Sequence, residues 1–321
     1  MAFPYIQGFG GMPISTTVAT VTAALARRGI QTPGTSGITT VAAGGKTWLR
    51  VLNNWAIEFA RWGATSSFWL GMRISGAAGT NVTQHGYLAG NVSPLYIALL
   101  NTGALRLYKD TSGTANDINL SLTVGSEVFV ELHINGTTLS VYLNGEATPS
   151  ATATVAAPLE YASYIADGDT GSNGQQFTDF YVNSTRLGDG SARLLATTTV
   201  SSNTGTVTGA ANAEEALGDY DTDAKYVTYA AGQKSILNQA GILDNPLTIS
   251  CVQVTALGKK TGTALQPEQV KLVTGSENTL LTVALSLANT GHNVSTTVDP
   301  HDSAAWTKAK INAMQVGVGS A

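Results

Sequence analysis

The chain has 321 residues, enough for two domains of ordinary size with separate cores. Its net charge is −4 and it has no Lys/Arg cluster, which argues against a nucleic-acid-binding protein, since these usually carry a basic patch. Charged residues make up only 12%, whereas small, turn-forming and β-branched residues dominate. This composition predicts an all-β protein of antiparallel β-sandwich domains, with many short strands and one or two short helices.

Residues 1–16 combine several glycines with the apolar side chains Phe3, Tyr5, Ile6 and Phe9. Glycines disfavour a regular element, and apolar side chains are costly to leave in water. We therefore expect an extended arm that docks on another subunit, with these four side chains as its anchors.

Residues 18–28 are the best helix candidate in the first half, because Arg27 and Arg28 suit the negative end of a helix and Gly29 can end it. Strand patterns follow in dense succession. We predict strands at residues 47–52, 55–61, 67–74, 87–89, 95–100, 105–109, 118–122 and 177–182.

Residues 129–145 carry the most specific local signal. Two alternating runs flank Asn135-Gly136, a pair that accepts the positive φ angles of a type I′ turn, so they predict a β-hairpin. One face of the first strand would hold Val130, Leu132 and Ile134. Asn144-Gly145 repeats the turn signal where the second strand ends.

A polar, glycine-rich break at residues 186–190 predicts the domain boundary, with one sandwich at residues 17–188 and a second at 189–321. In the second domain we predict a helical turn at Glu214 and Glu215 and a short helix at 304–313 anchored by Trp306. Strands are predicted at residues 191–200, 226–229, 249–254, 269–273, 280–287 and 314–318.

Three segments of the first domain, residues 68–73, 105–108 and 131–145, resemble the concanavalin-like or laminin-G-like jelly roll, and 177–182 is similar to its returning last strand. The second domain resembles the C-terminal part of structural proteins of tailed bacteriophages. Its matching segments are residues 187–189, 221–227, 249–254, 299–307 and 311–318. The resemblance implies a virion surface or tail-associated role and supplies no catalytic residues.

The sequence contains few candidate catalytic or ligand-binding residues. Glycoside hydrolysis needs two nearby carboxylates, and Glu131 is the sole acidic residue of the hairpin predicted at residues 129–145. Glu131 and His133 are the one acid and base on the same face of a confidently predicted strand, and we interpret them as part of a solvated sheet face. The histidines lack metal-ligand spacing, and Gly44-Gly45-Lys46-Thr47 lacks the first glycine of a phosphate loop.

Two acidic loops could hold a cation. Asp167 and Asp169 lie in a Gly/Asp-rich loop that lacks the Glu of an EF-hand, and laminin-G-like folds can hold calcium at loop tips. A flexible turn is the alternative. A second acidic group, at residues 219–223, has the same two interpretations. We expect no cofactor, apart from structural calcium at such a loop.

The N-terminus lacks a signal-peptide pattern and no run reaches the length of a membrane span. Synthesis in a cytoplasm and use on a particle surface outside it would agree with both this and the composition, so we expect a virion protein made in the host cytoplasm. Cys251 cannot form an internal disulfide, because it is the sole cysteine.

Our first functional hypothesis is a non-enzymatic bacteriophage virion protein that decorates or cements the capsid or forms part of the neck or tail surface. Its partners would be other virion proteins and further copies of itself; the resemblance favours a trimer. The alternative is a lectin-like module for host surface glycan, with Tyr161 and Tyr164 as stacking side chains. A polysaccharide-degrading enzyme is a third, disfavoured hypothesis. We expect no binding to nucleic acid or membrane.

Overall fold

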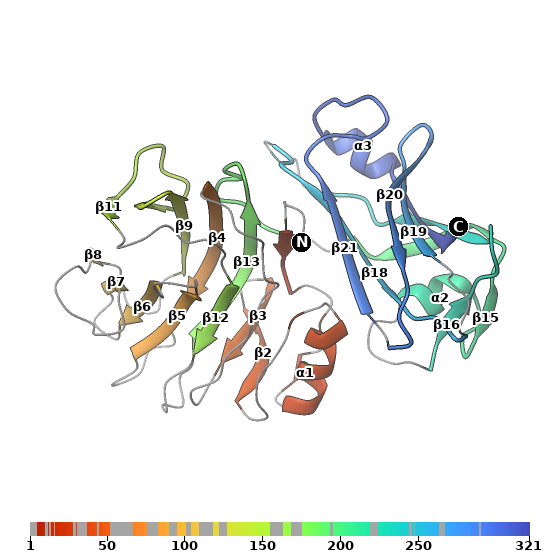
Figure 1. Cartoon of the computed structure of the whole chain (residues 1–321), viewed down its shortest axis with the longest axis horizontal. Coiled ribbons are helices and arrows are strands. Elements are labelled where there is room, and N and C mark those ends of the chain that lie inside the picture. Colours follow the sequence, from red (N-terminus) through yellow and green to blue (C-terminus); the bar gives the residue numbers. More distant parts are fainter. Residues whose placement is uncertain are drawn as a thin grey trace. The chain divides into compact units, whose positions relative to one another are not determined.

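Figure 1 shows the computed structural model of the chain. It describes residues 5–9, 12, 14, 15, 17–27, 30, 37–43, 45–51, 67–75, 83–89, 95–100, 104–108, 118–121, 127–154, 163–167, 175–192, 195–218, 224–243, 246, 248–262, 267–288 and 290–321. For residues 5–7, 51, 83–89, 95–100, 104–108, 118–121, 163–167 and 175, the backbone alone is described.

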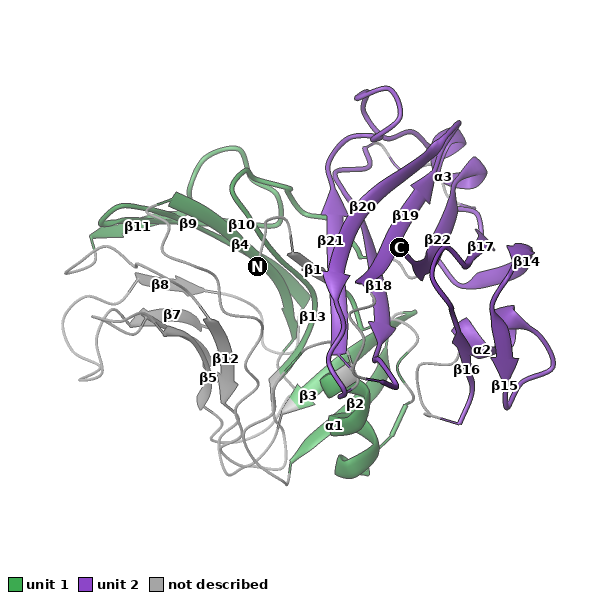
Figure 2. Cartoon of the chain, turned by 45° about the vertical axis from the view of Figure 1, so that its right-hand side comes forward, with its two compact units in different colours: residues 1–193 green, residues 194–321 purple. Residues whose placement is uncertain are grey.

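Two compact units divide the chain, unit 1 at residues 1–193 and unit 2 at residues 194–321 (Figure 2). The sequence placed the division between residues 188 and 189. The later boundary has a physical reason, because residues 186–192 bond to unit 1. Asp189 pairs with Arg73, and the Ala192 amide donates to Asp179 over 3.0 Å.

One layer of unit 1 is an eight-stranded antiparallel sheet, called sheet A, with the order β11-β10-β9-β4-β13-β3-β2 and β1 also paired with β13. Its strands are β1 (Tyr5–Gln7), β2 (Ile38–Ala43), β3 (Lys46–Val51), β4 (Ser67–Ser75), β9 (Glu127–Asn135), β10 (Thr138–Leu143), β11 (Ala151–Thr154) and β13 (Gln175–Asn183). Long-range pairing thus joins strands from both ends of the unit.

A five-stranded antiparallel sheet, called sheet B, has the order β12-β5-β6-β7-β8. Its strands are β5 (Thr83–Ala89), β6 (Leu95–Leu100), β7 (Ala104–Tyr108), β8 (Ile118–Ser121) and β12 (Ser163–Asp167). The chain passes from sheet A to sheet B after β4 and again after β11, as it does in a jelly-roll sandwich. The predicted strand at residues 55–61 lies outside the described residues.

The core of unit 1 follows from strand alternation. Every second side chain of β4 and of β9 is buried, because successive side chains of a strand point to opposite faces. The members that face the core are Phe68, Leu70, Met72 and Ile74 on β4 and Val128, Val130, Leu132 and Ile134 on β9. The opposite face of sheet A, called the outer face, carries the remaining residues of these strands.

The predicted hairpin is confirmed as β9 and β10. Asn135 pairs with Thr138 next to the turn, and Val130 pairs with Leu143 at the other end. Its turn differs from the prediction. Because Asn135 pairs with Thr138, the central residues are Gly136 and Thr137, and of these only Gly136 has a positive φ, 59°. Glycine at the first central position is typical of a type II′ turn.

The type I′ pattern occurs instead where β10 ends. Asn144 and Gly145 have φ angles of 48° and 79°, and the Glu146 amide donates to the Leu143 carbonyl over 3.0 Å. Both positive angles suit an Asn-Gly pair.

The N-terminal segment is part of unit 1, which corrects the expectation of an arm docked on another subunit. β1 pairs with β13, with Tyr5 opposite Val182 and Gln7 opposite Phe180. Phe9 is fully buried in the core and packs edge-to-face against Phe177, with ring centroids 5.7 Å apart. Phe9 therefore cannot anchor a partner.

Helix α1 (Val18–Arg27) confirms the predicted helix. Val21, Ala24 and Leu25 are buried at the i, i+3, i+4 spacing of one helix face, and the Ile30 amide bonds to the Leu25 carbonyl at its end. The helix thereby closes part of the core of unit 1.

Unit 2 is also built from antiparallel strands. A five-stranded sheet, called sheet C, has the order β14-β17-β22-β19-β20 and contains β14 (Thr197–Asn203), β17 (Lys234–Gln239), β19 (Pro267–Val273), β20 (Glu277–Ala284) and β22 (Gln315–Ser320). Two pairs accompany it, β15 (Thr206–Thr208) with β16 (Tyr226–Thr228) and β18 (Val252–Gly258) with β21 (Thr290–Thr296). The β18–β21 pair is called the ribbon.

The ribbon and sheet C share the core of unit 2, in which Val252 and Val254 of β18 cluster with Val270 and Leu272 of β19. Two short helices, α2 (Ala213–Gly218) and α3 (Lys308–Ala313), were both expected near these positions. Trp306 is buried before α3 and donates its indole N–H to the Thr296 carbonyl over 3.2 Å, so the predicted anchor is confirmed.

The predicted fold class is therefore confirmed: the chain is all-β with antiparallel sheets, and its described residues include three short helices where one or two were expected. Within the described ranges, no helix has the length and apolarity needed to span a membrane.

Candidate functional site

The outer face of sheet A brings polar and aromatic side chains together. Strand pairing places Trp69 of β4 opposite His133 of β9, and His133 opposite Ser140 of β10. One step along the strands, Glu131 lies between Gly71 and Tyr142. Because directly opposite residues share a face, these side chains form a continuous patch across three strands.

Trp69, His133 and Tyr142, called the aromatic cluster, are partly exposed, and Trp69 contacts both of the other rings. The rings of Trp69 and His133 stack, with centroids 4.2 Å apart and planes 8° from parallel, and Tyr142 lies 5.1 Å from Trp69. Arg186 places its guanidinium 4.4 Å from the centre of the Tyr142 ring and 5.3 Å from that of Trp69. Cation–π attraction therefore holds Arg186 against the cluster.

Glu131 lies beneath Arg186 and is fully buried. Its carboxylate accepts hydrogen bonds from the Tyr181 hydroxyl (2.5 Å), from Nε and Nη2 of Arg186 (2.9 and 2.5 Å) and from the Gly188 amide (3.0 Å). The interpretation of Glu131 as part of a solvated sheet face is therefore wrong. The chain after β13 turns back over the sheet and covers it, which strand alternation alone does not reveal.

Gly71 makes the Tyr181–Glu131 bond possible. A Cβ atom at position 71 would lie 2.1 Å from the Tyr181 ring, so only glycine lets this ring cross β4 toward Glu131. Burial is the main reason that the pKa of the Tyr181 hydroxyl is raised well above its usual value, and the Glu131 charge adds to it. Tyr181 is thus a fixed hydrogen-bond donor.

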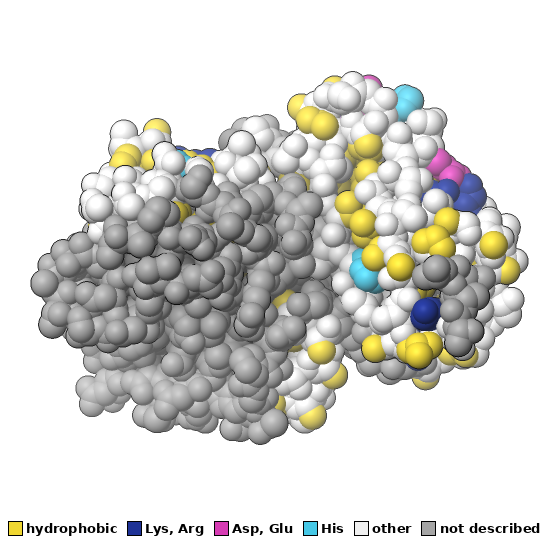
Figure 3. Space-filling model, viewed as in Figure 1, with side chains coloured by type: hydrophobic (Ala, Val, Ile, Leu, Met, Phe, Trp, Pro, Cys, Tyr) yellow, Lys and Arg dark blue, Asp and Glu magenta, His cyan; other side chains and the backbone are white. Residues whose placement is uncertain are grey.

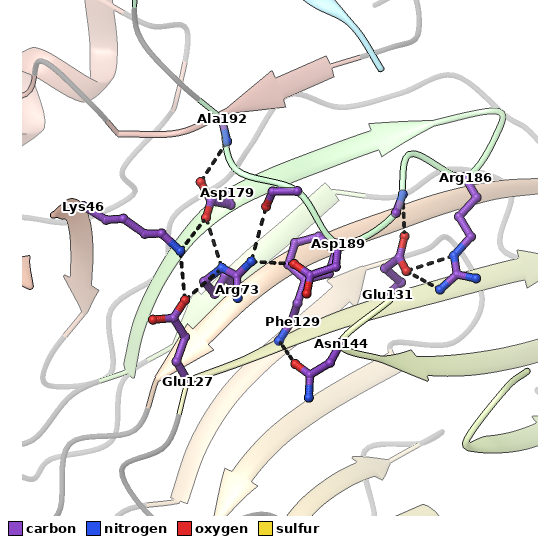
Figure 4. A network of polar contacts seen from close by, with 12 residues as sticks. Lys46, Arg73, Glu127, Phe129, Glu131, Asn144, Asp179, Arg186, Asp189 and Ala192 are labelled. Carbon is purple, nitrogen blue, oxygen red and sulfur yellow. Dashed lines mark hydrogen bonds and ion pairs between the residues drawn. The ribbon is translucent and has the colours of Figure 1, made fainter. Parts of the chain in front are cut away.

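A second ionic group lies farther along the same face (Figure 4). Arg73 contacts Asp189 at 2.5 Å, Asp179 at 3.1 Å and Glu127 at 3.0 Å, and Lys46 contacts Glu127 at 2.9 Å. Burial opposes the charge of Arg73, but these carboxylates outweigh it and raise the pKa of its guanidinium. The network ties residues 186–192, here called the strap, to β4 and β13.

His133 is the one side chain of the cluster able to titrate near neutrality. Burial lowers its pKa, so its ring is neutral at pH 7 and can both donate and accept a hydrogen bond. Its Nε2 lies 3.5 Å from the Ser67 hydroxyl. Glu131 is engaged by Tyr181, Arg186 and Gly188, so these contacts do not join it to His133 as a catalytic acid–base pair.

None of the interface, glycan-stacking or cation residues predicted from the sequence belongs to the aromatic cluster. Among the proposed interface residues, Phe9 is buried, Tyr5 and Ile6 lie on β1 without described side chains, and Phe3 lies outside the described residues. The proposed glycan-stacking Tyr164 and the cation candidate Asp167 lie on β12, where the backbone alone is described.

Tyr161, Asp169 and residues 219–223 also lie outside the described residues. In the part of the chain that the structure describes, no three His, Cys, Asp or Glu side chains gather as metal ligands would.

The aromatic cluster was missed, although part of its signal was visible. Trp69 alternates with buried Phe68 and Leu70, which assigns it to the outer face. The contribution of Arg186 could not be read from sequence, because it depends on the path of the strap.

No family model and no curated protein matches this chain. Solved structures do. A carbohydrate-binding module, CBM66 of Bacillus subtilis, matches with 13% identity and a TM-score of 0.37 over 49% of this chain and 96% of its own.

The galectin LEC-6 of Caenorhabditis elegans matches with 15% identity and a TM-score of 0.32, over 42% of this chain and 93% of its own. A native glycosidic hydrolase matches with 10% identity and a TM-score of 0.39, over 56% and 94%. At this level the likeness concerns the β-sandwich fold and says nothing about a ligand.

Proposed function

We propose that unit 1 is a non-enzymatic saccharide-binding module and that its site is the aromatic cluster on the outer face of sheet A. The observation that carries the proposal is the set of partly exposed rings Trp69, His133 and Tyr142, fixed on three paired strands beside Arg186. Figure 3 shows hydrophobic, basic and histidine side chains close together at the upper left of the view.

The chemistry of the site favours an uncharged sugar. Glu131 compensates the charge of Arg186, and His133 is neutral at pH 7, so the site has little attraction for an anion. Trp69 and Tyr142 offer apolar surface to the C–H groups of a sugar ring. Hydroxyls would bond to His133, Ser67 and Ser140 and to the edge of Arg186, whose side chain is 23% exposed.

A non-enzymatic role is supported by the state of the acidic groups on this face. Glu131 is engaged by four donors, and Asp179 pairs with Arg73 and Lys46. The more exposed Glu127 and Asp189 are also held in ion pairs, Glu127 with Lys46 and Arg73 and Asp189 with Arg73. None of these four carboxylates is available as the acid or nucleophile that glycoside hydrolysis requires.

A glycan array probed with the full chain, followed by calorimetric titration of its best ligand, tests this proposal. We expect an uncharged saccharide to bind, and Trp69→Ala to weaken binding at least tenfold, about 1.4 kcal/mol. Tyr226→Ala is the matched control, because Tyr226 is an exposed aromatic residue of unit 2. A blank array, or equal affinity of Trp69→Ala and wild type, would refute it.

We also propose that the chain is a virion component of a tailed bacteriophage, on the capsid or on the neck or tail surface. This rests on the resemblance of residues 187–189, 221–227, 249–254, 299–307 and 311–318. The two roles are compatible, because a particle protein can carry a lectin-like domain.

Mixing the purified chain with phage particles that lack it tests the virion role. We expect stoichiometric recovery with sedimented particles, and a homo-oligomer by analytical ultracentrifugation, with a trimer as the favoured state. A monomer that stays in the supernatant contradicts the proposal. Deleting residues 1–16 is not a suitable test, because it removes β1 and Phe9 from the fold of unit 1.

A further inference from the structure

Glu268 and His292 meet inside unit 2, between sheet C and the ribbon. Glu268 lies on β19 on the same face as Val270 and Leu272, and it is 5% exposed. His292 lies on β21, opposite Ala256 of β18, with a side chain that is 14% exposed. A carboxyl group and an imidazole ring thus lie between sheet C and the ribbon, where the neighbouring core residues are apolar.

The two groups face each other without completing a bond. Oε2 of Glu268 and Nε2 of His292 are 4.0 Å apart, and neither buried atom has a hydrogen-bond partner in the described part of the chain. Both oxygens of Glu268 also lie against β18, since a Cβ atom at Gly258 would be 3.0 Å from each. The carboxyl group is therefore enclosed by the ribbon.

Few other titratable groups face this pair. The Tyr229 hydroxyl donates a hydrogen bond to Ser235 over 2.7 Å. Burial raises its pKa to about 12, and the charge of Glu268 contributes to this shift, so the hydroxyl stays protonated. On the opposite face of sheet C, Lys234 and Lys271 both pair with Glu277. On the ribbon side, Lys259 and Lys260 follow Gly258. None of the described ion pairs joins either lysine to Glu268.

An uncompensated charge in such a place is costly, so the pair favours the protonation state with no net charge. The deprotonated pair consists of a buried carboxylate and a neutral ring, with a net charge of about −1. After uptake of one proton, the pair is either a carboxylic acid beside imidazole or a carboxylate beside imidazolium, and both forms are neutral overall. Burial accordingly raises the pKa of Glu268 to about 7 and lowers that of His292.

We propose that Glu268 and His292 form a proton-operated latch between sheet C and the ribbon. Uptake of one proton from solvent lets Oε2 and Nε2 close from 4.0 Å to hydrogen-bonding distance, which joins β19 to β21. Loss of the proton leaves a buried anion that is better solvated when the ribbon opens locally, so the layers loosen in alkaline solution.

The direction of the effect follows from linkage. The raised pKa of Glu268 means that the folded state holds a proton that the unfolded state has lost, so its stabilisation is full below about pH 4.5 and disappears as the pH rises through about 7. The lowered pKa of His292 acts oppositely: its contribution is present above about pH 6.5 and is lost as the pH falls further. Between pH 6 and pH 8.5 the Glu268 effect dominates.

Hydrogen exchange of the full chain tests the latch in peptides from β18 and β21, after correction for the intrinsic pH dependence of exchange. We expect protection to fall severalfold from pH 6.0 to pH 8.5 in wild type, because a fall of about tenfold from Glu268 is partly offset by His292. Glu268→Gln should abolish this fall. Glu277→Gln, on the opposite face of sheet C, should retain it.

Equal corrected protection at the two pH values, or a fall that persists in Glu268→Gln, would overturn the proposal. Carbon-13 NMR titration of the Glu268 carboxyl group in wild type provides a measurement that needs no variant. An apparent pKa near the ordinary 4.5 would be equally decisive against the latch.

Discussion

At the scale of single residues, Glu131 and Arg186 depend on each other. Glu131 is fully buried, and Arg186 supplies the opposite charge, with Tyr181 and Gly188 as further donors. A buried ion pair adds little net stability over a well-packed apolar pair, but removal of one partner leaves an uncompensated charge. The pair therefore specifies where the strap lies.

Glu131→Ala should lower the free energy of unfolding of unit 1 by about 3 kcal/mol, because Arg186 and Tyr181 lose their common acceptor. Urea titration followed by tryptophan fluorescence measures this, since four of the five tryptophans lie in residues 1–193. Glu146→Ala, at an exposed carboxylate bonded to Ser150, should change it by less than about 0.5 kcal/mol. Equal midpoints for the two variants would show that the buried acceptor is dispensable.

Gly71→Ala should destabilise unit 1 by roughly 1–3 kcal/mol, because the new methyl group would meet the Tyr181 ring. Gly190→Ala is a suitable control: the nearest atom to its added Cβ would be 3.9 Å away, and its φ is not positive. Urea midpoints provide the comparison. If Gly71→Ala unfolds with wild-type stability, Tyr181 does not need the close approach seen here.

At the scale of elements, β1 and the loop after it complete the core of unit 1. β1 extends the pairing of β13, and Phe9 fills space beside Phe177. An apolar segment near a chain end was expected to need a partner molecule, and the partner is the chain's own core.

Phe9→Ala should cost unit 1 about 3–5 kcal/mol, because it removes a buried ring and leaves a cavity. Ile14→Ala, at a side chain 56% exposed, should cost little. Thermal unfolding monitored by tryptophan fluorescence distinguishes them. A Phe9→Ala protein with unchanged unfolding but altered association would restore the interface interpretation of this residue.

Sequence patterns predicted elements where a face alternates clearly and failed where burial comes from tertiary contacts. The β9–β10 hairpin was predictable from alternation and Asn-Gly pairs, although its turn is shifted by one residue. β21, Thr290–Thr296, was missed because its partly buried residues are mostly polar. The site was not predictable, because burial of Glu131 and placement of Arg186 depend on a strap distant in sequence from β9.

At the scale of the whole molecule, each unit has its own core and its own sheets. The boundary falls after the strap and not before it, because the ionic contacts of residues 186–192 belong to unit 1. Any dissection of the chain must respect these contacts.

A fragment of residues 1–193 should fold and keep the affinity of the full chain for its saccharide, whereas residues 1–183 should be less stable by several kcal/mol, because Glu131 and Arg73 lose their partners. Circular dichroism and urea titration of both fragments measure this difference. Identical stability would place the strap outside the folded unit.

The strap also determines how unit 1 responds to tension. A pull on the chain beyond residue 193 reaches the bond from Ala192 to Asp179 first, then the Asp189–Arg73 pair, then Glu131, and only afterwards the end of β13. The first contact loads β13 within the strand, at Asp179, and the next two pass force sideways into β4 and β9, before the load reaches the end of β13 that continues into the strap. Under such a pull, the end of β13 would be loaded last, although it is the point at which the strap is covalently joined to the sheet.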